Sequence, residues 1–306
     1  MTANTLLVTV AVLTYRRPDD LAELLPQLCE QAEASRDDVK VLVVDNDALA
    51  GARELCEQFA PRSVHYLHEP TPGISSARNR ALDASVGDDV LVYIDDDERP
   101  LDGWLESMLV LYRERRPAGV VGPVISRFDG EPEPFVAAGR FFDRRRLPTG
   151  TAVDVAATNN LLLDLRQVGA LRFDPEFGLS GGSDTLFTRQ LVARGGQLLW
   201  CDEAIVVDVV PAARLTRSWV LRRAFRSGNS WSRTSIRLAR TPLHRALTRL
   251  DLSSRGLARV ISGAGLRAIG ALTRTGHLQA KGLRRLQRGG GMLTGAWGHV
   301  YSEYGR

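Results

Sequence analysis

An acidic run, Asp95-Asp96-Asp97-Glu98, directly follows the apolar segment at residues 90–94. Carboxylates placed this close together repel one another unless a cation neutralises them. Hard divalent cations take oxygen ligands, and Mg²⁺ is usually held by one or two carboxylates together with substrate phosphates. The run therefore predicts a Mg²⁺ or Mn²⁺ site that works with a diphosphate. An exposed acidic turn after a strand is the alternative, so the interpretation needs other residues at the same place.

Two further polar residues follow apolar segments in the same way. Thr14 follows the segment at residues 7–13, and Asp45 follows the segment at residues 39–44. In open α/β sheets, ligands bind beyond the carboxyl ends of the strands. We therefore expect Thr14, Asp45 and the acidic run to share one pocket, in which Asp45 could hydrogen-bond a ribose or base. Turn formation by Asp45-Asn46-Asp47 is the purely local alternative.

Arg78 lies in a segment, Gly73-Ile74-Ser75-Ser76-Ala77-Arg78, that reads as a turn followed by a helix. Ser75 is predicted to cap this helix, and backbone N–H groups in a first helical turn favour anions. Arg78 is therefore a candidate to meet a phosphate or a base. Capping alone would explain the same residues.

Asp184 is the candidate general base. It follows Gly181, Gly182 and Ser183 at the start of a predicted helix. Glycines let a ligand approach the backbone closely, and a nearby carboxylate can take the proton from an attacking hydroxyl. An aspartate that caps a helix after turn glycines is the alternative.

The elements that must position these residues alternate along the first hundred residues. Apolar, β-branched segments alternate with helix-like ones, and such βα units predict a parallel sheet with helices on its faces. The expected strands are residues 7–13, 39–44, 64–67 and 90–94, and the expected helices are residues 19–34, 50–59 and 75–84.

The later part of the chain has a different pattern. We expect a helix at residues 104–116, strands at residues 119–124, 160–163 and 198–200, and a helix at residues 185–194. After residue 211 the sequence predicts helices at residues 215–236 and 243–286. The predicted organisation is a nucleotide-binding half (residues 1–110), an acceptor half (residues 111–212) and a basic helical appendage (residues 213–306).

Charge is distributed unevenly along the 306 residues. Residues 214–306 hold 19 Lys and Arg against Asp251 and Glu303, whereas residues 1–213 hold 21 basic and 34 acidic residues. Such a split suggests contact with an anionic surface or ligand, for example at the inner face of a membrane. Apolar residues such as Leu257 and Ile261 recur among arginines there, as in interfacial helices. A solvated arginine-rich helical surface that packs on the parent domain is the alternative.

The three cysteines and the apolar segments bear on the compartment. Cys29, Cys56 and Cys201 are odd in number and lack metal-ligand spacing, so they support neither a disulfide framework nor a zinc site. No apolar segment is long enough to span a bilayer, and the first residues lack the pattern of a secretory signal. These observations favour a cytoplasmic protein.

Taken together, these motifs resemble those of the family 2 inverting glycosyltransferases of bacterial polysaccharide and glycoconjugate synthesis. The resemblance covers about residues 6–232, and the ordered set is more specific than any one motif. Its motifs are Val12-Leu13-Thr14-Tyr15-Arg16-Arg17, Val43-Val44-Asp45-Asn46, Gly73-Ile74-Ser75-Ser76-Ala77-Arg78-Asn79, Tyr93-Ile94-Asp95-Asp96-Asp97-Glu98 and Gly181-Gly182-Ser183-Asp184-Thr185-Leu186-Phe187.

The resemblance implies a GT-A fold and a role for each motif. Thr14, Asp45 and Arg78 would contact the donor nucleotide, together with Asp95 and Asp96. Asp95 and Asp97 would form the D-x-D pair at the ribose and the metal-bound diphosphate.

On the acceptor side, Gly181 and Gly182 would border the acceptor and Asp184 would be the base. Relatives usually have Glu-Asp after the glycines, whereas this chain has Ser183-Asp184. Relatives also often have a metal-reaching histidine where this chain has Asp208. Asp208 is therefore only a candidate oxygen ligand.

The implied partners are a nucleoside-diphosphate sugar and an unidentified hydroxyl acceptor, such as a lipid-linked sugar or a secondary metabolite. Two other functions remain open, namely a sugar-1-phosphate nucleotidyltransferase and an inactive nucleotide-sugar-binding scaffold. The first would be expected to carry a Gly-rich, Lys-containing loop after its first strand, which residues 13–18 lack. A nucleic-acid partner is disfavoured because the basic tail has few interleaved aromatic residues.

Overall fold

A computed structural model describes residues 5–301, which form two compact units. Unit 1 comprises residues 5–125, 144–178 and 183–208. Unit 2 comprises residues 126–143, 179–182 and 209–301. Each unit is described by itself below.

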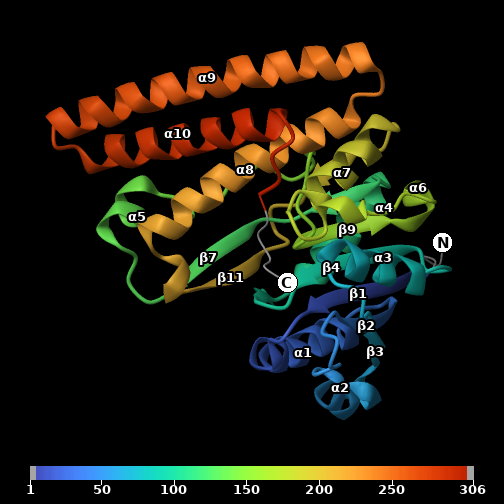
Figure 1. Cartoon of the computed structure of the whole chain (residues 1–306). Coiled ribbons are helices and arrows are strands. Elements are labelled where there is room, and N and C mark those ends of the chain that lie inside the picture. Colours follow the sequence, from blue (N-terminus) through green and yellow to red (C-terminus); the bar gives the residue numbers. More distant parts are fainter. Residues whose placement is uncertain (1–4, 302–306) are drawn as a thin grey trace. The chain divides into compact units, whose positions relative to one another are not determined.

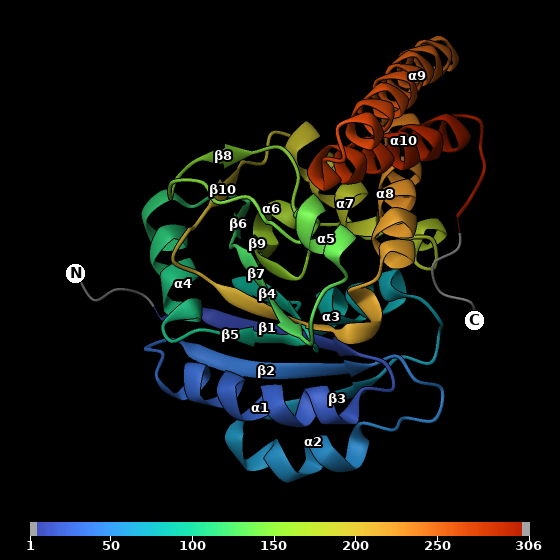
Figure 2. The same ribbon diagram turned by 90° about the vertical axis from the view of Figure 1, so that its left-hand side faces the viewer.

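Unit 1 is built around an eight-stranded mixed sheet with the order β3-β2-β1-β4-β9-β6-β10-β8. The strands β3, β2, β1 and β4 run parallel, as the alternation of apolar segments and helices predicts, whereas β9 runs antiparallel to β4 and β6 (Figure 2). The strands are β1 (Leu7–Thr14), β2 (Asp38–Asp45), β3 (Val64–His68), β4 (Val90–Asp95), β6 (Gly119–Val121), β8 (Ala152–Val153), β9 (Asn160–Asp164) and β10 (Leu198–Trp200).

Both faces of this sheet are covered. Successive side chains of a strand point to opposite faces, so Val10 and Val12 of β1 join one buried cluster and Ala11 and Leu13 join the other. The first cluster includes residues of α1 (Pro18–Glu33), α2 (Arg53–Phe59) and α4 (Trp104–Arg115). The second includes residues of α3 (Ile74–Ala84), α6 (Leu165–Val168) and α7 (Ser183–Ala193). A two-sided core of this kind fixes the strand ends in place.

A second, three-stranded sheet has the order β5-β11-β7. Its strands are β5 (Glu98–Pro100), β7 (Val124–Asp129) and β11 (Val206–Pro211). The expected single strand at residues 119–124 is wrong. It divides at Gly122-Pro123 into β6 and β7, which belong to different sheets, because proline cannot donate a ladder hydrogen bond.

Unit 2 contains four helices within the described residues. They are α5 (Pro134–Gly139), α8 (Arg217–Leu238), α9 (Pro242–Leu272) and α10 (Gly276–Ala296). In Figure 1, α10 lies between α9 and α8. The expected single helical stretch at residues 243–286 is therefore a hairpin. It reverses at Thr273–Thr275, where Arg274 adopts a left-handed φ of 53°.

Glycines let α9 and α10 approach closely. A Cβ atom on Gly263 would stand 2.7 Å from the carbonyl oxygen of Gly282, and one on Gly289 would stand 2.6 Å from that of Gly256. Neither distance is possible for a real side chain without movement of the backbone. Gly256, Gly263 and Gly270 recur every seven residues and therefore form one row on the face of α9 that meets α10.

The fold class expected from the sequence is confirmed: an α/β domain with a C-terminal helical region. All three cysteines are buried free thiols. Within residues 5–301, no helix combines the length and the apolar character that a membrane-spanning helix needs.

Candidate functional site

The polar residues predicted to share one pocket do lie at one edge of the large sheet. Thr14 at the end of β1 is the register partner of Asp45 at the end of β2. On the other side of β1, Leu13 is the register partner of Asp95 at the end of β4. The expected convergence of the three strand ends is therefore confirmed.

Arg17 neutralises part of the acidic run. One of its terminal nitrogens lies 2.9 Å from Asp96 Oδ1 and 2.8 Å from Asp97 Oδ2. The Thr14 hydroxyl donates a 2.9 Å hydrogen bond to Asp96 Oδ2. Burial raises the pKa of Asp96, and the charge of Arg17 opposes that rise. A single guanidinium thus offsets two neighbouring carboxylates.

Asp95 and Glu98 form the most buried part of the cluster. Glu98 accepts hydrogen bonds from the Asn159 amide at 2.6 Å and from the backbone N–H of Asp95 at 3.3 Å. Burial and, second, the charge of Asp97 raise the pKa of Asp95 to about 7. Burial and the charge of Asp95 raise the pKa of Glu98 well above its ordinary value. These shifts mean that a proton or an added cation is favoured at the cluster over two buried carboxylates that are both charged.

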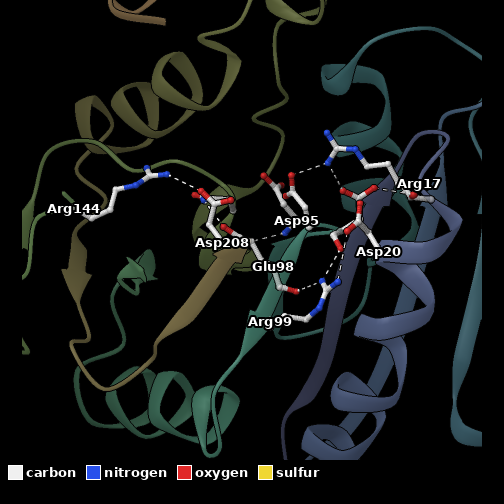
Figure 3. A network of polar contacts seen from close by, with 11 residues as sticks. Arg17, Asp20, Asp95, Glu98, Arg99, Arg144 and Asp208 are labelled. Atoms are coloured by element: carbon white, nitrogen blue, oxygen red, sulfur yellow. Dashed lines mark hydrogen bonds and ion pairs between the residues drawn. The ribbon is translucent and has the colours of Figure 1, made fainter. Parts of the chain in front are cut away.

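Asp208 belongs to the same cluster. It is the register partner of Glu98 in the β5–β11 ladder, and its charge contributes to the raised pKa of Glu98. Arg144 lies 3.2 Å from its carboxylate. Figure 3 shows Asp95, Glu98 and Asp208 near one another, with Arg144 on the Asp208 side and Arg17 on the opposite side of the group. Asp208, which stands where relatives often have a histidine, is thus close to the acidic run.

Arg99 holds the backbone of the acidic run. Its guanidinium donates hydrogen bonds to the carbonyl oxygens of Asp96 and Glu98, and it forms a 2.8 Å ion pair with Glu23 of α1 (Figure 3). The side chain is mostly buried. It therefore fixes the direction in which the preceding carboxylates leave the strand.

Asp45 is fully engaged within unit 1. One oxygen accepts a hydrogen bond from the backbone N–H of Asp47, and the other accepts from the backbone N–H of Ala52 and the Tyr66 hydroxyl. Its side chain is buried. The carboxylate therefore fixes the loop that follows β2, at the edge where a nucleotide is expected.

Arg78 connects α3 to the start of α7. It donates a 2.8 Å hydrogen bond to the Ser183 hydroxyl, and its guanidinium lies 5.4 Å from the centre of the Phe173 ring. Its Nε is buried and has no hydrogen-bond partner among residues 5–301. The predicted capping role of Ser75 is wrong, because Gly73 occupies the cap position and the Ser75 hydroxyl donates to the Asp174 carbonyl oxygen instead.

Asp184 lies in the first turn of α7. Its Oδ1 accepts a 2.7 Å hydrogen bond from the backbone N–H of Thr185, while Oδ2 accepts none from the described part of the chain. Its charge is among the smaller contributions to the raised pKa of Asp95. The preceding Gly181 and Gly182 have φ values of 75° and 96°, a conformation that other residues rarely adopt.

No group of three or more His, Cys, Asp or Glu side chains within residues 5–301 is arranged to hold a metal ion by itself. A cation at this edge would thus need further ligands from a substrate, which is the usual arrangement for Mg²⁺.

Sequence reasoning missed Arg17, Arg99 and Asn159. Arg17 could have been found, because it follows Thr14 in the loop at the same edge of the sheet. Asn159 is 61 residues from its partner Glu98 and carries no local signal.

Carboxylates, a hydroxyl and an arginine gathered at the carboxyl ends of parallel strands define an α/β protein that binds its ligand at that edge. The comparisons with known proteins give the particular family. The sequence model described as "Glycosyl transferase family 2" matches residues 9–163. The succinoglycan biosynthesis protein ExoM of Rhizobium meliloti is 35% identical over 238 residues, which cover 76% of each chain. This chain belongs to glycosyl transferase family 2.

More distant relatives agree with this assignment. The pre-mycofactocin glycosyltransferase of Mycobacterium tuberculosis is 27% identical over 73% of this chain and 46% of its own length. The mannosyltransferase PcManGT of Pyrobaculum calidifontis, solved with GDP-Man and Mn2+, has a TM-score of 0.62 at 17% identity and covers 96% of this chain and 88% of its own. S. aureus TarS, solved with UDP-GlcNAc, has a TM-score of 0.53 at 14% identity, with 92% and 90% covered. The structural likenesses show the fold, and the predicted class of enzyme, a glycosyltransferase, is confirmed by the family.

Proposed function

We propose that the chain transfers a sugar from a nucleoside-diphosphate sugar to an acceptor hydroxyl, with a divalent cation and with inversion at the anomeric carbon. The observation that carries the proposal is the cluster of carboxylates gathered at the sheet edge, where an added cation would offset the cost of burying Asp95 and Glu98 in their charged forms. The GDP-Man and Mn2+ of PcManGT and the UDP-GlcNAc of TarS support a donor of this class.

The residues present fit a Mg²⁺ or Mn²⁺ ion. Asp95 and Asp97 would hold it together with oxygens of the donor diphosphate, since carboxylate and phosphate oxygens suit both ions, and Asp208 is a candidate for a further ligand. When bound, the ion supplies Lewis-acid stabilisation of the charge that grows on the leaving diphosphate. Because Arg17 already contacts Asp97, cation binding and the position of this guanidinium are linked.

The donor would be held by groups at the neighbouring strand ends. Thr14 and Asp45 stand next to each other in register, and Asp96 is fixed by the Thr14 hydroxyl. These groups would orient the nucleoside. Arg78 keeps a buried Nε without a hydrogen-bond partner among the described residues, which suits a phosphate oxygen or a base carbonyl.

Asp184 would be the general base. The acceptor oxygen forms a bond to the anomeric carbon, the bond to the diphosphate breaks, and the acceptor proton passes to Asp184. Its Oδ2 has no donor among residues 5–301, which leaves that oxygen for the proton. Gly181 and Gly182 would let the acceptor approach the backbone. The similarity to ExoM, a succinoglycan biosynthesis protein, supports a growing bacterial polysaccharide as the acceptor.

A thermal-shift screen identifies the donor nucleotide. Uridine, guanosine and thymidine diphosphates are each added with Mn²⁺, and a ligand present at 100 times its dissociation constant stabilises the fold by about 2.7 kcal/mol. The expected result is one nucleotide that stabilises the chain only when Mn²⁺ is present. If none of the nucleotides raised the unfolding temperature, the proposal would be contradicted.

Asp184→Asn tests the base. We expect donor binding to be retained and the transfer rate to fall about 10²–10⁴-fold, the usual contribution of a general base. The control is Asp83→Asn, since Asp83 is exposed on α3 and pairs only with Arg172 among the described residues. Transfer by Asp184→Asn at the parent rate would show that another group takes the proton.

A further inference from the structure

The outward face of α9 is apolar along its whole length. Side chains spaced three or four residues apart lie on one face of a helix. On α9 this row contains no charged residue, and its other positions hold Ser, Gly and Ala. Its large members, all exposed, are Leu243, Leu247, Leu250, Leu257, Ile261 and Leu272.

This row faces away from the rest of unit 2. The glycine row of Gly256, Gly263 and Gly270 packs against α10 and occupies the opposite side of α9. The exposure of Leu243 is 71% and that of Leu272 is 86%, so the row is uncovered at both ends. At 1.5 Å per residue, the 31 residues of α9 present an apolar strip of about 46 Å. Soluble chains rarely expose apolar side chains in such a continuous arrangement.

The hairpin that carries this strip is strongly basic. Residues 242–296 contain ten Lys and Arg and a single acidic residue, Asp251, which is paired with Arg255 at 2.9 Å. Burial and the nearby charges of Arg259 and Arg284 lower the pKa of Arg288. None of these three arginines forms an ion pair with a residue in the range 5–301. Within the described residues, the hairpin thus carries positive charge that an anionic partner could neutralise.

We propose that the outward face of α9 lies in the interface of a bilayer that carries anionic headgroups. The leucine row enters the boundary between headgroups and acyl chains, and the arginines on the other sides of α9 and on α10 meet the headgroup phosphates. A free phosphate would satisfy the arginines but leave the apolar strip exposed. A second copy of the chain would cover the strip but would bring two strongly basic hairpins together.

Vesicle co-sedimentation of the full chain tests this proposal. The probes are vesicles of phosphatidylcholine alone and vesicles that also contain phosphatidylglycerol. We expect sedimentation with the anionic vesicles and little with the neutral ones, and weaker binding at high salt because salt screens the headgroup charge. The assay contains no donor and no metal, so failure of the proposed function would leave its outcome unaffected.

Leu247→Gln/Ile261→Gln removes two members of the strip without changing the charge. We expect its binding to anionic vesicles to fall about tenfold or more, because each leucine-sized group contributes to interfacial burial. The matched control is Val86→Gln/Val110→Gln, which alters two exposed residues of unit 1 and should bind as the parent does. Both variants should keep the parental unfolding temperature by circular dichroism, since all four side chains are exposed.

Three results would overturn the proposal. The parent chain fails to sediment with anionic vesicles, or Leu247→Gln/Ile261→Gln binds them as well as the control does. Alternatively, light scattering shows a parental dimer that this variant converts to a monomer, which would identify the face as an interface between copies.

Discussion

The acidic cluster of unit 1 and the basic hairpin of unit 2 carry excess charge of opposite sign in different settings. In the cluster, Asp95 and Glu98 are held by buried hydrogen bonds, and Arg17, Arg99 and Arg144 come from separate parts of the chain to offset the charge. In the hairpin, ten basic residues share one aspartate.

This difference indicates what kind of ligand suits the acidic cluster and what kind suits the basic hairpin. The cluster is small, and hydrogen bonds hold its buried carboxylates, so it suits one small cation in a defined place. The hairpin is unbalanced over a long surface, so it suits an extended anionic partner. The following experiments test whether the two regions are as independent as this comparison implies.

Metal removal should have the largest effect. EDTA, or Asp97→Asn, should lower the transfer rate at least about a hundredfold, because a Lewis acid contributes several kcal/mol to stabilising the leaving diphosphate. Vesicle binding should not change, since the hairpin contains no acidic cluster. The measurement is initial transfer rate with and without added Mn²⁺. If the chain transferred sugar in EDTA at the rate seen with Mn²⁺, the reaction would not depend on a divalent cation.

Gly263→Ala should have an intermediate effect, confined to stability. Its Cβ would stand 2.7 Å from the backbone atoms of Gly282 and Leu286, so α9 and α10 must separate. We expect the free energy of unfolding to fall by about 1–3 kcal/mol, the usual cost of overpacking. The measurement is denaturant unfolding.

Gly265→Ala is the matched control, because a Cβ there meets nothing within 4 Å. It should be neutral or stabilise by up to about 1 kcal/mol, since alanine favours a helix more than glycine does. Equal effects of the two substitutions would argue against close packing of the hairpin.

The pH dependence of cation binding should be the smallest effect. The pKa of Asp95 is raised from 3.8 to about 7, so a proton competes with the cation as the pH falls through about 7. We expect Mn²⁺ affinity to fall about fivefold from pH 7 to pH 6. Asp95→Asn should abolish this dependence along with much of the affinity. Calorimetric titration at several pH values measures both.

The free energy of unfolding of the metal-free chain should depend on pH in the opposite direction from the Mn²⁺ affinity. A carboxyl group with a raised pKa binds its proton more tightly in the folded state than in the unfolded state. Its contribution to stability is therefore complete below pH 3.8 and is lost as the pH rises through about 7. The measurement is the unfolding temperature of the metal-free parent chain and of metal-free Asp95→Asn at several pH values. The same pH dependence in both proteins would contradict this assignment.

The strand core and the gathering of strand-end residues could be predicted from the sequence. The segments of β1, β2 and β4 are continuous and β-branched, and parallel strands bring their carboxyl ends to one edge. The bounds of β10 also agree with the sequence, because Leu198–Trp200 is a short apolar segment between polar ones.

Other features depend on partners that are distant along the chain. Arg17 contacts Asp97 across 80 residues, so its position after Thr14 places it at the right sheet edge but does not name its partner. The Ser75 side chain reaches Asp174 across 99 residues rather than capping its own helix. Likewise, β5 is only three residues long and exists because β11 pairs with it. Local propensity cannot report such pairings.

The sevenfold spacing of Gly256, Gly263 and Gly270 limits how this protein can vary in length. Inserting one residue into α9 would turn every later glycine by about 100° around the helix axis and bring bulky side chains against α10. Deleting one residue would do the same in the other direction. Homologous chains that keep this hairpin should therefore differ in its length by whole multiples of seven residues in each arm.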